Sequence, residues 1–233
     1  MNENFAGDRK NLTHFLLRFE RMIIDALVPL VPAWINTAHL TLMTLAWSVL
    51  IMACGYWANL NINWLWGFNA FILLQYLTDM LDGEVGRRRN TGLIKWGFYM
   101  DHFLDYVFLC AITAGYSFLL PRSFDGLVLL SLAAAGGFMV HTFLDFAITK
   151  DFKISFGWFG VSEMRHTLII FNALVVFFGK ALLVNVFPVF TAVLCIGLCA
   201  AVYRSQKFYG QKDMMLKADN AGPSHGQMAA AAH

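Results

Sequence analysis

Long apolar runs alternate with short polar stretches along this chain, and within the runs polar and apolar residues do not alternate. A hydrocarbon core about 30 Å thick is crossed by roughly 20 apolar residues of helix, whereas the strands of a membrane barrel alternate in polarity. The runs that fit a crossing helix are residues 38–58, 62–81, 96–119, 126–148, 167–181 and 184–203. The pattern therefore predicts an all-α integral membrane protein with six transmembrane helices.

The segment before the first run, residues 11–35, has a different pattern. Phe15, Phe19 and Met22 recur at helical spacing with charged residues between them, and Pro29 follows. This favours an N-terminal amphipathic helix in the membrane interface, with a cytosolic helix packed on the bundle as the alternative. We expect a cytoplasmic N-terminal region at 1–36, a transmembrane catalytic domain at 37–206 and a mobile cytoplasmic tail at 207–233.

The composition agrees with a membrane protein. Of the 233 residues, 58% are hydrophobic and 14% are charged, and the mean hydropathy is +0.57, whereas soluble domains carry about 25% charged residues. The four cysteines are scattered within apolar runs without metal-ligand spacing, which is typical of packing residues. A soluble globular enzyme, a disordered chain and a disulfide scaffold are excluded, and a net charge of +2 is too small to indicate a nucleic-acid partner.

The basic residues are unevenly distributed among the polar stretches. All of the 17 lysines and arginines except Arg122 and Lys180 lie before the first run, between the second and third, between the fourth and fifth, or after the last. Cytoplasmic segments of membrane proteins are enriched in lysine and arginine. We therefore expect both termini to be cytoplasmic, in a multi-pass protein of a bacterial inner membrane.

Four aspartates stand at the cytoplasmic ends of the second and third runs. Asp79 and Asp82 are one helical turn apart, as are Asp101 and Asp105, so each pair shares a helix face. The short connection predicts antiparallel neighbouring helices whose carboxylate pairs face each other. Converging carboxylates repel one another unless cations neutralise them, and an all-oxygen set suits Mg²⁺, Mn²⁺ or Ca²⁺ better than Zn²⁺.

Small residues and an arginine surround these pairs. Glycines leave room for a ligand or a facing helix to approach the backbone, and here they are Gly83, Gly86, Gly92 and Gly97. Arg87, one turn after Gly83, carries a guanidinium that can bind phosphate oxygens with two hydrogen bonds. Together with metal-binding carboxylates, these residues predict a diphosphate site.

The order and spacing of these residues resemble the signature of the CDP-alcohol phosphotransferases, also called phosphatidyltransferases, which is D-x2-D-G-x2-A-R-x8-9-G-x3-D-x3-D. In this chain the pattern reads Asp79-x2-Asp82-Gly83-x2-Gly86-Arg87-x9-Gly97-x3-Asp101-x3-Asp105. It departs at Gly86, where the family usually has alanine. Because glycine is also small, we expect the site to be preserved in a helix weakened by roughly 1 kcal/mol. The six-helix topology extends the resemblance to about residues 10–210.

The resemblance implies an enzyme of membrane phospholipid synthesis. Members transfer a substituted phosphate group from a CDP-alcohol to the hydroxyl of a second alcohol and release CMP, and one of the two substrates is a lipid. They are homodimers with a polar cavity open to the cytoplasm. By position, the ligands of two divalent cations, Mg²⁺ or Mn²⁺, are Asp79, Asp82 and Asp101, and the residues that contact the CDP portion are Gly83, Gly86 and Arg87. Asp105 is the expected general base and a fourth candidate metal ligand.

Four further polar residues are candidates for binding the acceptor or supporting the aspartates. With His102, the second half of the motif reads Asp-His-x2-Asp, which resembles the choline/ethanolamine phosphotransferase branch of the family. The alternative is that His102 is simply a polar residue on the helix face. Glu163 and Arg165 precede the fifth run, where some members have an acidic-basic segment facing the cavity. A capping box at Ser162 with an ordinary interfacial arginine is the alternative there. Asp145 lies inside the fourth run, where an ionisable residue needs a partner.

Other interpretations remain open from the sequence. A UbiA-like prenyltransferase also binds a diphosphate through aspartate motifs, on helices far apart in sequence, and a small cation transporter would distribute polar residues through the membrane depth. The donor is either CDP-choline or CDP-ethanolamine, with diacylglycerol as acceptor, or CDP-diacylglycerol, with a small polar alcohol as acceptor. Asn36, His39 and Thr41 match in part a short Pro-Asn-x-x-Thr-like segment that the family often has near the nucleotide.

Overall fold

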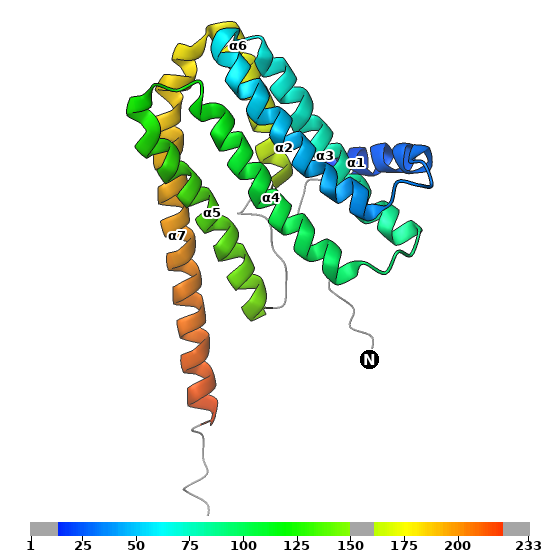
Figure 1. The fold of residues 1–233 in the computed structure, drawn as a ribbon. Coiled ribbons are helices and arrows are strands. Elements are labelled where there is room, and N and C mark those ends of the chain that lie inside the picture. The colour runs from blue at the N-terminus through cyan, green and yellow to red at the C-terminus, as the bar shows by residue number, and fades with distance from the viewer. Residues whose placement is uncertain (1–13, 150–160, 221–233) are drawn as a thin grey trace, which may run out of the picture.

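The computed structural model describes residues 14–149 and 161–220, which form helices and no strand (Figure 1). Each of the six predicted runs falls on a helix of its own, from α2 to α7, which confirms the all-helical prediction. Two short 3-10 helices are η1 (Val28–Leu30) and η2 (Arg122–Phe124). The α-helices are α1 (His14–Leu27), α2 (Thr37–Leu60), α3 (Trp64–Arg88), α4 (Ile94–Ser117), α5 (Asp125–Thr149), α6 (Val161–Phe178) and α7 (Lys180–Asn220).

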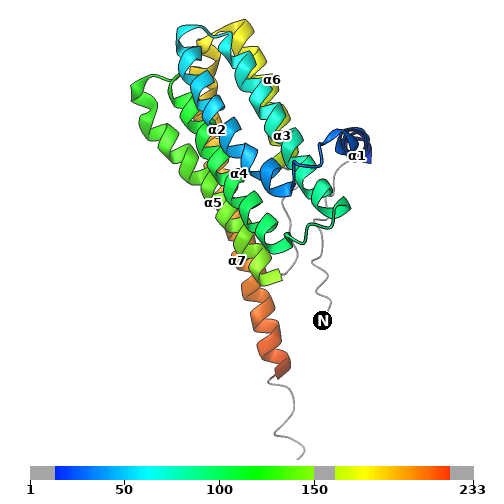
Figure 2. The ribbon, with the colours of Figure 1, turned by 45° about the vertical axis from the view of Figure 1, so that its right-hand side comes forward.

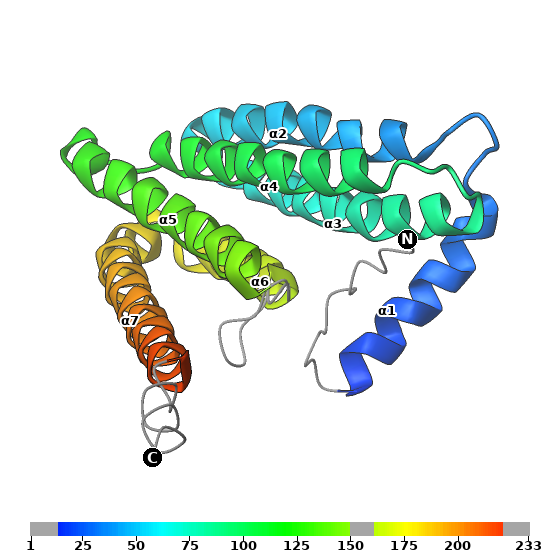
Figure 3. The ribbon, with the colours of Figure 1, turned by 90° about the horizontal axis from the view of Figure 1, so that it is seen from below.

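Helices α2 to α7 form a ring in which each helix packs against two others (Figure 3). Helix α2 packs against both α3 and α4, α3 packs against α6, α6 against α7, α7 against α5, and α5 against α4. Helices α3 and α4 run antiparallel and meet through their side chains, as predicted: the rings of Phe68 and Tyr116 are 5.3 Å apart, and Asp79 contacts Asp101. Their backbones approach each other less closely than either approaches α2. The connection at 89–93, which spans up to about 17 Å, joins them.

Two glycines let α2 approach α4 closely. A Cβ atom on Gly55 would lie 2.5 Å from the Cα of Gly115, and one on Gly115 would lie 2.6 Å from the ring of Phe68. Small residues at such crossings allow helix backbones to pack. The buried apolar core of α2, α3 and α4 includes Ile51, Cys54, Ile72, Phe108 and Ile112.

The last two helices meet at Gly179. Its φ of +84° is a conformation that glycine adopts without steric cost, and it ends α6 a few residues before 181, the predicted end of the fifth run. Helix α7 has 41 residues and is roughly 60 Å long, about twice the thickness of a hydrocarbon core. It continues past residue 206, the expected end of the transmembrane domain, and the rest of the tail, 221–233, lies outside the described residues.

Within residues 14–149 and 161–220, three helical segments are long and apolar enough to cross a membrane, namely Thr37–Leu60, Arg122–Thr149 and Lys180–Ala218. Their outer surfaces agree with this: Val189, Val193 and Ile196, on one face of α7, are 63%, 64% and 69% exposed. Large exposed apolar faces are typical of surfaces that contact lipid or a partner. Helices α3 and α4 are as long but more polar, and the apolar part of α6, Met164–Phe178, is shorter.

Helix α1 lies crosswise beside the C-terminal part of α3 (Figure 2). It ends at Leu27, two residues before Pro29, because proline lacks the N–H that would continue the helix. Arg88 of α3 pairs with Asp25 of α1, and Arg89 donates hydrogen bonds to backbone carbonyls of the segment after α1, at Val31 and Ile35. These contacts fasten α1 to the end of α3 that carries the aspartates.

Candidate functional site

The four aspartates of α3 and α4 come together at one end of the bundle. Asp101 is in hydrogen-bonding contact with Asp79 and within electrostatic range of Asp82 and Asp105. The side chains of Asp79, Asp101 and Asp105 are 22%, 35% and 26% exposed, and Asp82 is buried. The two carboxylate pairs therefore meet, as their spacing predicts.

Helix α2 supplies a hydroxyl to this cluster. Thr41 Oγ1 lies 2.7 Å from Asp82 Oδ2 and 2.9 Å from the backbone oxygen of Thr37, and because a hydroxyl carries one proton it donates to one of them at a time. The other two residues of the partial family match, Asn36 and His39, form a capping box that starts α2. Of the three, only Thr41 contacts an aspartate in the described structure.

Arg165 of α6 joins the two carboxylate pairs. Its Nη1 donates to Asp79 Oδ2 at 2.8 Å and its Nη2 donates to Asp105 Oδ1 at 3.1 Å. The side chain is only 8% exposed, and the guanidinium carbon lies 5.6 Å from the centre of the Tyr76 ring. Of the two interpretations left open by the sequence, an ordinary interfacial arginine does not fit this burial, whereas a residue that faces the site does.

The aspartates have the chemistry of a divalent-cation site, but their side chains are not gathered around one point. Among residues 14–149 and 161–220, no group of three His, Cys, Asp or Glu side chains is placed to hold a metal ion, because Asp79 and Asp105 are turned to Arg165 and Asp82 to Thr41. Carboxyl groups this close need a shared proton or a cation, and one guanidinium does not neutralise four carboxylates. Carboxylate oxygens of this kind are the ligands that Mg²⁺ and Mn²⁺ prefer in proteins.

His102 lies beside the cluster and is held by aromatic neighbours. Its Nδ1 donates to the backbone oxygen of Phe98 at 2.7 Å and lies 3.5 Å from Asp101 Oδ2. The ring packs on Phe98 and on Phe143 of α5. This position favours a supporting role next to Asp101 over a polar residue on an outer helix face.

The residues that the resemblance assigns to CDP lie on the last turns of α3. Arg87, 71% exposed, pairs with Glu84 at 2.8 Å, and hydrogen bonds from Arg88 and Arg87 lower the pKa of Glu84. A Cβ on Gly83 would lie 3.4 Å from Nη1 of Arg87, so this glycine keeps space beside the guanidinium. A groove of about 490 Å³ separates α1 from this turn and is lined by Glu20, Arg21, Ile24, Asp25, Glu84 and Arg87.

Asp145 and Glu163 are not shown to belong to the site. Asp145 accepts a hydrogen bond from the hydroxyl of Tyr209 and so links α5 to the distal part of α7 instead of joining the four aspartates. The partner that an intramembrane carboxylate needs is therefore a tyrosine. The side chain of Glu163 lies outside the described part of the structure.

Polar side chains deeper in the bundle were not identified from the sequence. Asn172 donates to Asn69 Oδ1 at 2.8 Å and accepts from the Tyr116 hydroxyl at 2.7 Å, so that one amide links α6, α3 and α4. Gln75, one turn before Asp79, is fully buried, and neither polar atom of its side chain has a hydrogen-bond partner among the described residues. An unsatisfied buried polar group costs about 1–3 kcal/mol. The signal for Gln75 was its place in an apolar run four residues from an aspartate.

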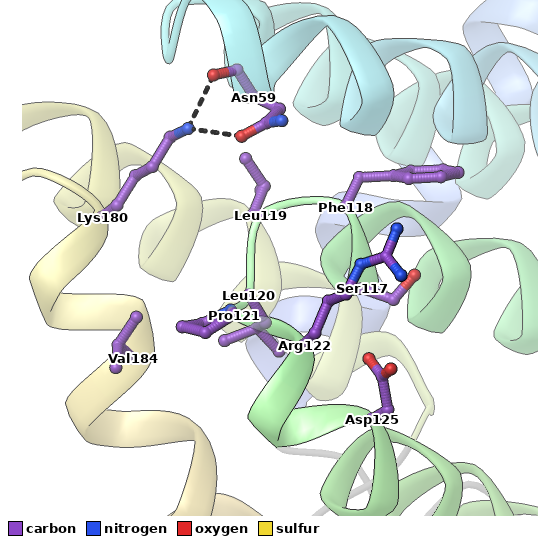
Figure 4. A pocket seen from close by; sticks show the side chains of 10 residues that line it. All are labelled: Asn59, Ser117, Phe118, Leu119, Leu120, Pro121, Arg122, Asp125, Lys180 and Val184. Carbon is purple, nitrogen blue, oxygen red and sulfur yellow. Dashed lines mark hydrogen bonds between the residues drawn. The ribbon is translucent and has the colours of Figure 1, made fainter.

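A cavity of about 690 Å³ lies at the opposite end of the bundle (Figure 4). Arg122 and Lys180, the two basic residues set apart in the sequence, both line it. Lys180 Nζ donates to the backbone oxygen and to Oδ1 of Asn59, at 2.7 and 2.9 Å. This lysine therefore fastens the start of α7 to the end of α2, and the cavity is not part of the aspartate cluster.

The chain matches no protein-family model, and no curated protein or solved structure is found to be similar to it. Its likeness to a family thus consists of the spaced residues between 79 and 105 and of the helical pattern around them. Any function assigned to the chain has to be argued from these residues and their geometry.

Proposed function

We propose that this protein is a membrane CDP-alcohol phosphotransferase, which transfers a substituted phosphate group from a CDP-alcohol to the hydroxyl of a second alcohol and releases CMP. One observation carries the proposal: four aspartates with the spacing of that signature meet from two helices, and one buried arginine bridges Asp79 and Asp105. Such a carboxylate cluster, next to glycines and a basic helix end, has the components of a diphosphate site.

The proposal assigns two divalent cations to Asp79, Asp82 and Asp101, with Asp105 as a fourth candidate ligand. Cations bound there would hold the donor diphosphate and neutralise charge on the departing CMP. The chain supplies the carboxylates that would bind these cations. Asp79 becomes available when Arg165 turns away from it, while the other carboxylates already lie within the same cluster.

The residues at the end of α3 bind the nucleotide side of the donor. Gly83 allows the diphosphate to approach the helix backbone, since it carries no side chain, whereas the space beside Gly86 is occupied by Thr37 of α2. Arg87 is exposed and held only by a neighbouring glutamate in this structure. It can exchange Glu84 for phosphate oxygens, to which a guanidinium donates two parallel hydrogen bonds.

Asp105 accepts the proton of the acceptor hydroxyl. As the hydroxyl oxygen bonds to the phosphorus that carries the donor alcohol, the bond from that phosphorus to the CMP oxygen breaks, and CMP leaves with the electron pair. Arg165 holds Oδ1 of Asp105, which leaves Oδ2 for the proton. A base within hydrogen-bond reach accelerates such a step by about 10²- to 10⁴-fold.

The proposal includes a membrane arrangement. All six helices α2 to α7 cross the bilayer, α1 lies in the interface, and both termini are cytoplasmic. Three segments of sufficient length and apolarity support this, as does the position of Arg87, Arg88 and Arg89 at the aspartate end while Arg122 and Lys180 line the cavity at the other. A homodimer stays a prediction of the resemblance.

Release of CMP by the purified protein tests the proposal. The assay combines Mg²⁺ or Mn²⁺ with CDP-choline, CDP-ethanolamine or CDP-diacylglycerol and the matching acceptors. We expect Asp105→Asn to lose at least 100-fold in turnover while it still folds and binds the CDP-alcohol. Asp145→Asn is the matched control, because it makes the same change on a helix carboxylate that contacts Tyr209, and it should keep turnover within a few-fold.

Each outcome has a clear meaning. Normal turnover by Asp105→Asn removes this residue from the base role. No CMP release by the unaltered protein with either donor class contradicts the proposed function. Metal uptake into liposomes without any CMP release favours a cation transporter instead.

A further inference from the structure

Gln75 is an exception among the buried amides of the described chain. Asn69 and Asn172 are hydrogen-bonded to each other and to Ile169 and Tyr116. Gln75 has 0% exposure, and neither its Nε2 nor its Oε1 has a partner. Buried polar groups in native proteins are nearly always paired. We therefore expect the Gln75 amide to find a hydrogen-bond partner in another arrangement of the side chains at the site.

The position of Gln75 on α3 identifies that partner. Gln75, Asp79 and Asp82 follow one another at successive turns of one helix face. Side chains four residues apart on a helix meet, and Gln–Asp pairs at this spacing form hydrogen bonds. In this structure Asp79 instead accepts from Nη1 of Arg165 and contacts Asp101. Asp79, the carboxylate nearest to Gln75 on this helix face, is therefore bonded to other groups. The Gln75 amide has no hydrogen-bond partner among the described residues.

We infer that Gln75 is a positioning residue for Asp79. When Arg165 releases Asp79, Nε2–H of Gln75 donates to one oxygen of that carboxylate and leaves the other oxygen directed into the site. This inference rests on the proposed function, because it assigns Asp79 to cation binding. Groups that orient metal ligands in this way typically change metal affinity by 10- to 100-fold when they are removed.

Measuring both the unfolding midpoint and the Mn²⁺ affinity distinguishes a positioning role of Gln75 from a purely packing role. Gln75→Met keeps the length of the side chain and removes both unpaired polar atoms. We expect its thermal unfolding midpoint to equal or exceed that of the unaltered protein, while its affinity for Mn²⁺, measured from the electron paramagnetic resonance signal of free Mn²⁺, falls about tenfold. Gln75→Leu serves the same purpose if the methionine variant cannot be purified.

Asn172→Leu is the matched control, because Asn172 is an equally buried amide whose partners are present. It should lower the unfolding midpoint, and the folded protein should keep its Mn²⁺ affinity within threefold. A lowered midpoint for Gln75→Met would show that the amide is paired in the native protein and would overturn the inference. A change in Mn²⁺ affinity of less than threefold would overturn it as well.

The two proposals fail in different ways. If the unaltered protein binds Mn²⁺ but releases no CMP from any donor, the proposed function fails and the Mn²⁺ affinities still decide the role of Gln75. If it releases CMP and Gln75→Met binds Mn²⁺ normally, only the inference on Gln75 fails. If the unaltered protein binds no Mn²⁺, both are overturned.

Discussion

Thr37 of α2 occupies the space that a side chain at Gly86 of α3 would need. A Cβ on Gly86 would lie 2.9 Å from Oγ1 and 3.6 Å from Cγ2 of Thr37, and Thr37 is buried at the start of α2. This contact explains why the chain departs from the alanine of the family signature at this position. The sequence alone favours alanine on helix propensity, whereas the packing in this structure favours glycine.

We predict that Gly86→Ala lowers the stability of the protein by about 1 kcal/mol, because overpacking costs about 1–3 kcal/mol and the gain in helix propensity offsets only part of it. In a Thr37→Ala background the same substitution should raise stability instead. Thermal unfolding in detergent, followed by tryptophan fluorescence, measures both. Equal effects of Gly86→Ala in the two backgrounds would contradict the contact.

Thr41→Val tests the hydrogen bond between α2 and Asp82. Valine has the shape of threonine without the hydroxyl, so the buried Asp82 loses its donor from α2. We expect about tenfold slower CMP release and a loss of about 1–2 kcal/mol in stability. Ser48→Ala is the control, since the Ser48 hydroxyl is buried on the same helix but bonds only to the backbone oxygen of Thr44; turnover by that variant should be unchanged.

Arg165→Gln removes the guanidinium that bridges Asp79 and Asp105. Asp79 and Asp105 then lose their partner, and breaking a buried ion pair costs about 3–5 kcal/mol. Millimolar Mg²⁺ should restore much of this stability, because it neutralises the same carboxylates, whereas chelation with EDTA should not. Unfolding midpoints that are equal in Mg²⁺ and in EDTA would argue against cation binding by these residues.

The crossing of α2 and α4 should tolerate no side chain at Gly55. We predict that Gly55→Ala lowers stability by about 1–3 kcal/mol, because its Cβ would press on the backbone of Gly115. Gly210→Ala is the comparison, since nothing lies within 4 Å of its Cβ position in α7, and there alanine should stabilise by up to about 1 kcal/mol. Similar unfolding midpoints for the two variants would contradict the close crossing.

The helices and the meeting of the aspartates were predictable from the sequence for physical reasons. The apolar runs had to be buried in lipid or protein, and carboxylates three or four residues apart had to share a face. The termination of α1 before Pro29 and the boundary at Gly179 follow from the backbone chemistry of proline and glycine.

The partners of these residues were not predictable, because they come from distant parts of the chain. Nothing in the sequence near Asp82 indicates Thr41, and nothing near Asp145 indicates Tyr209. The short connection predicts α3 and α4 as neighbours, but it does not indicate that α2 packs more closely against each of them than they pack against each other. Gln75 gives a weaker signal than a charged residue, although a neutral amide in an apolar run also needs a partner.

Helix α2 packs against both α3 and α4, the two helices that carry the aspartates. The backbones of α3 and α4 approach each other less closely than either approaches α2, so the spacing of their carboxylates depends on how both helices pack on α2. Under the proposed function, a slight tilt of α4 at its glycine crossing would change the space between the two carboxylate pairs. Membrane helices accommodate a mismatch in bilayer thickness partly by tilting, so the rate of CMP release should then depend on the thickness of the bilayer.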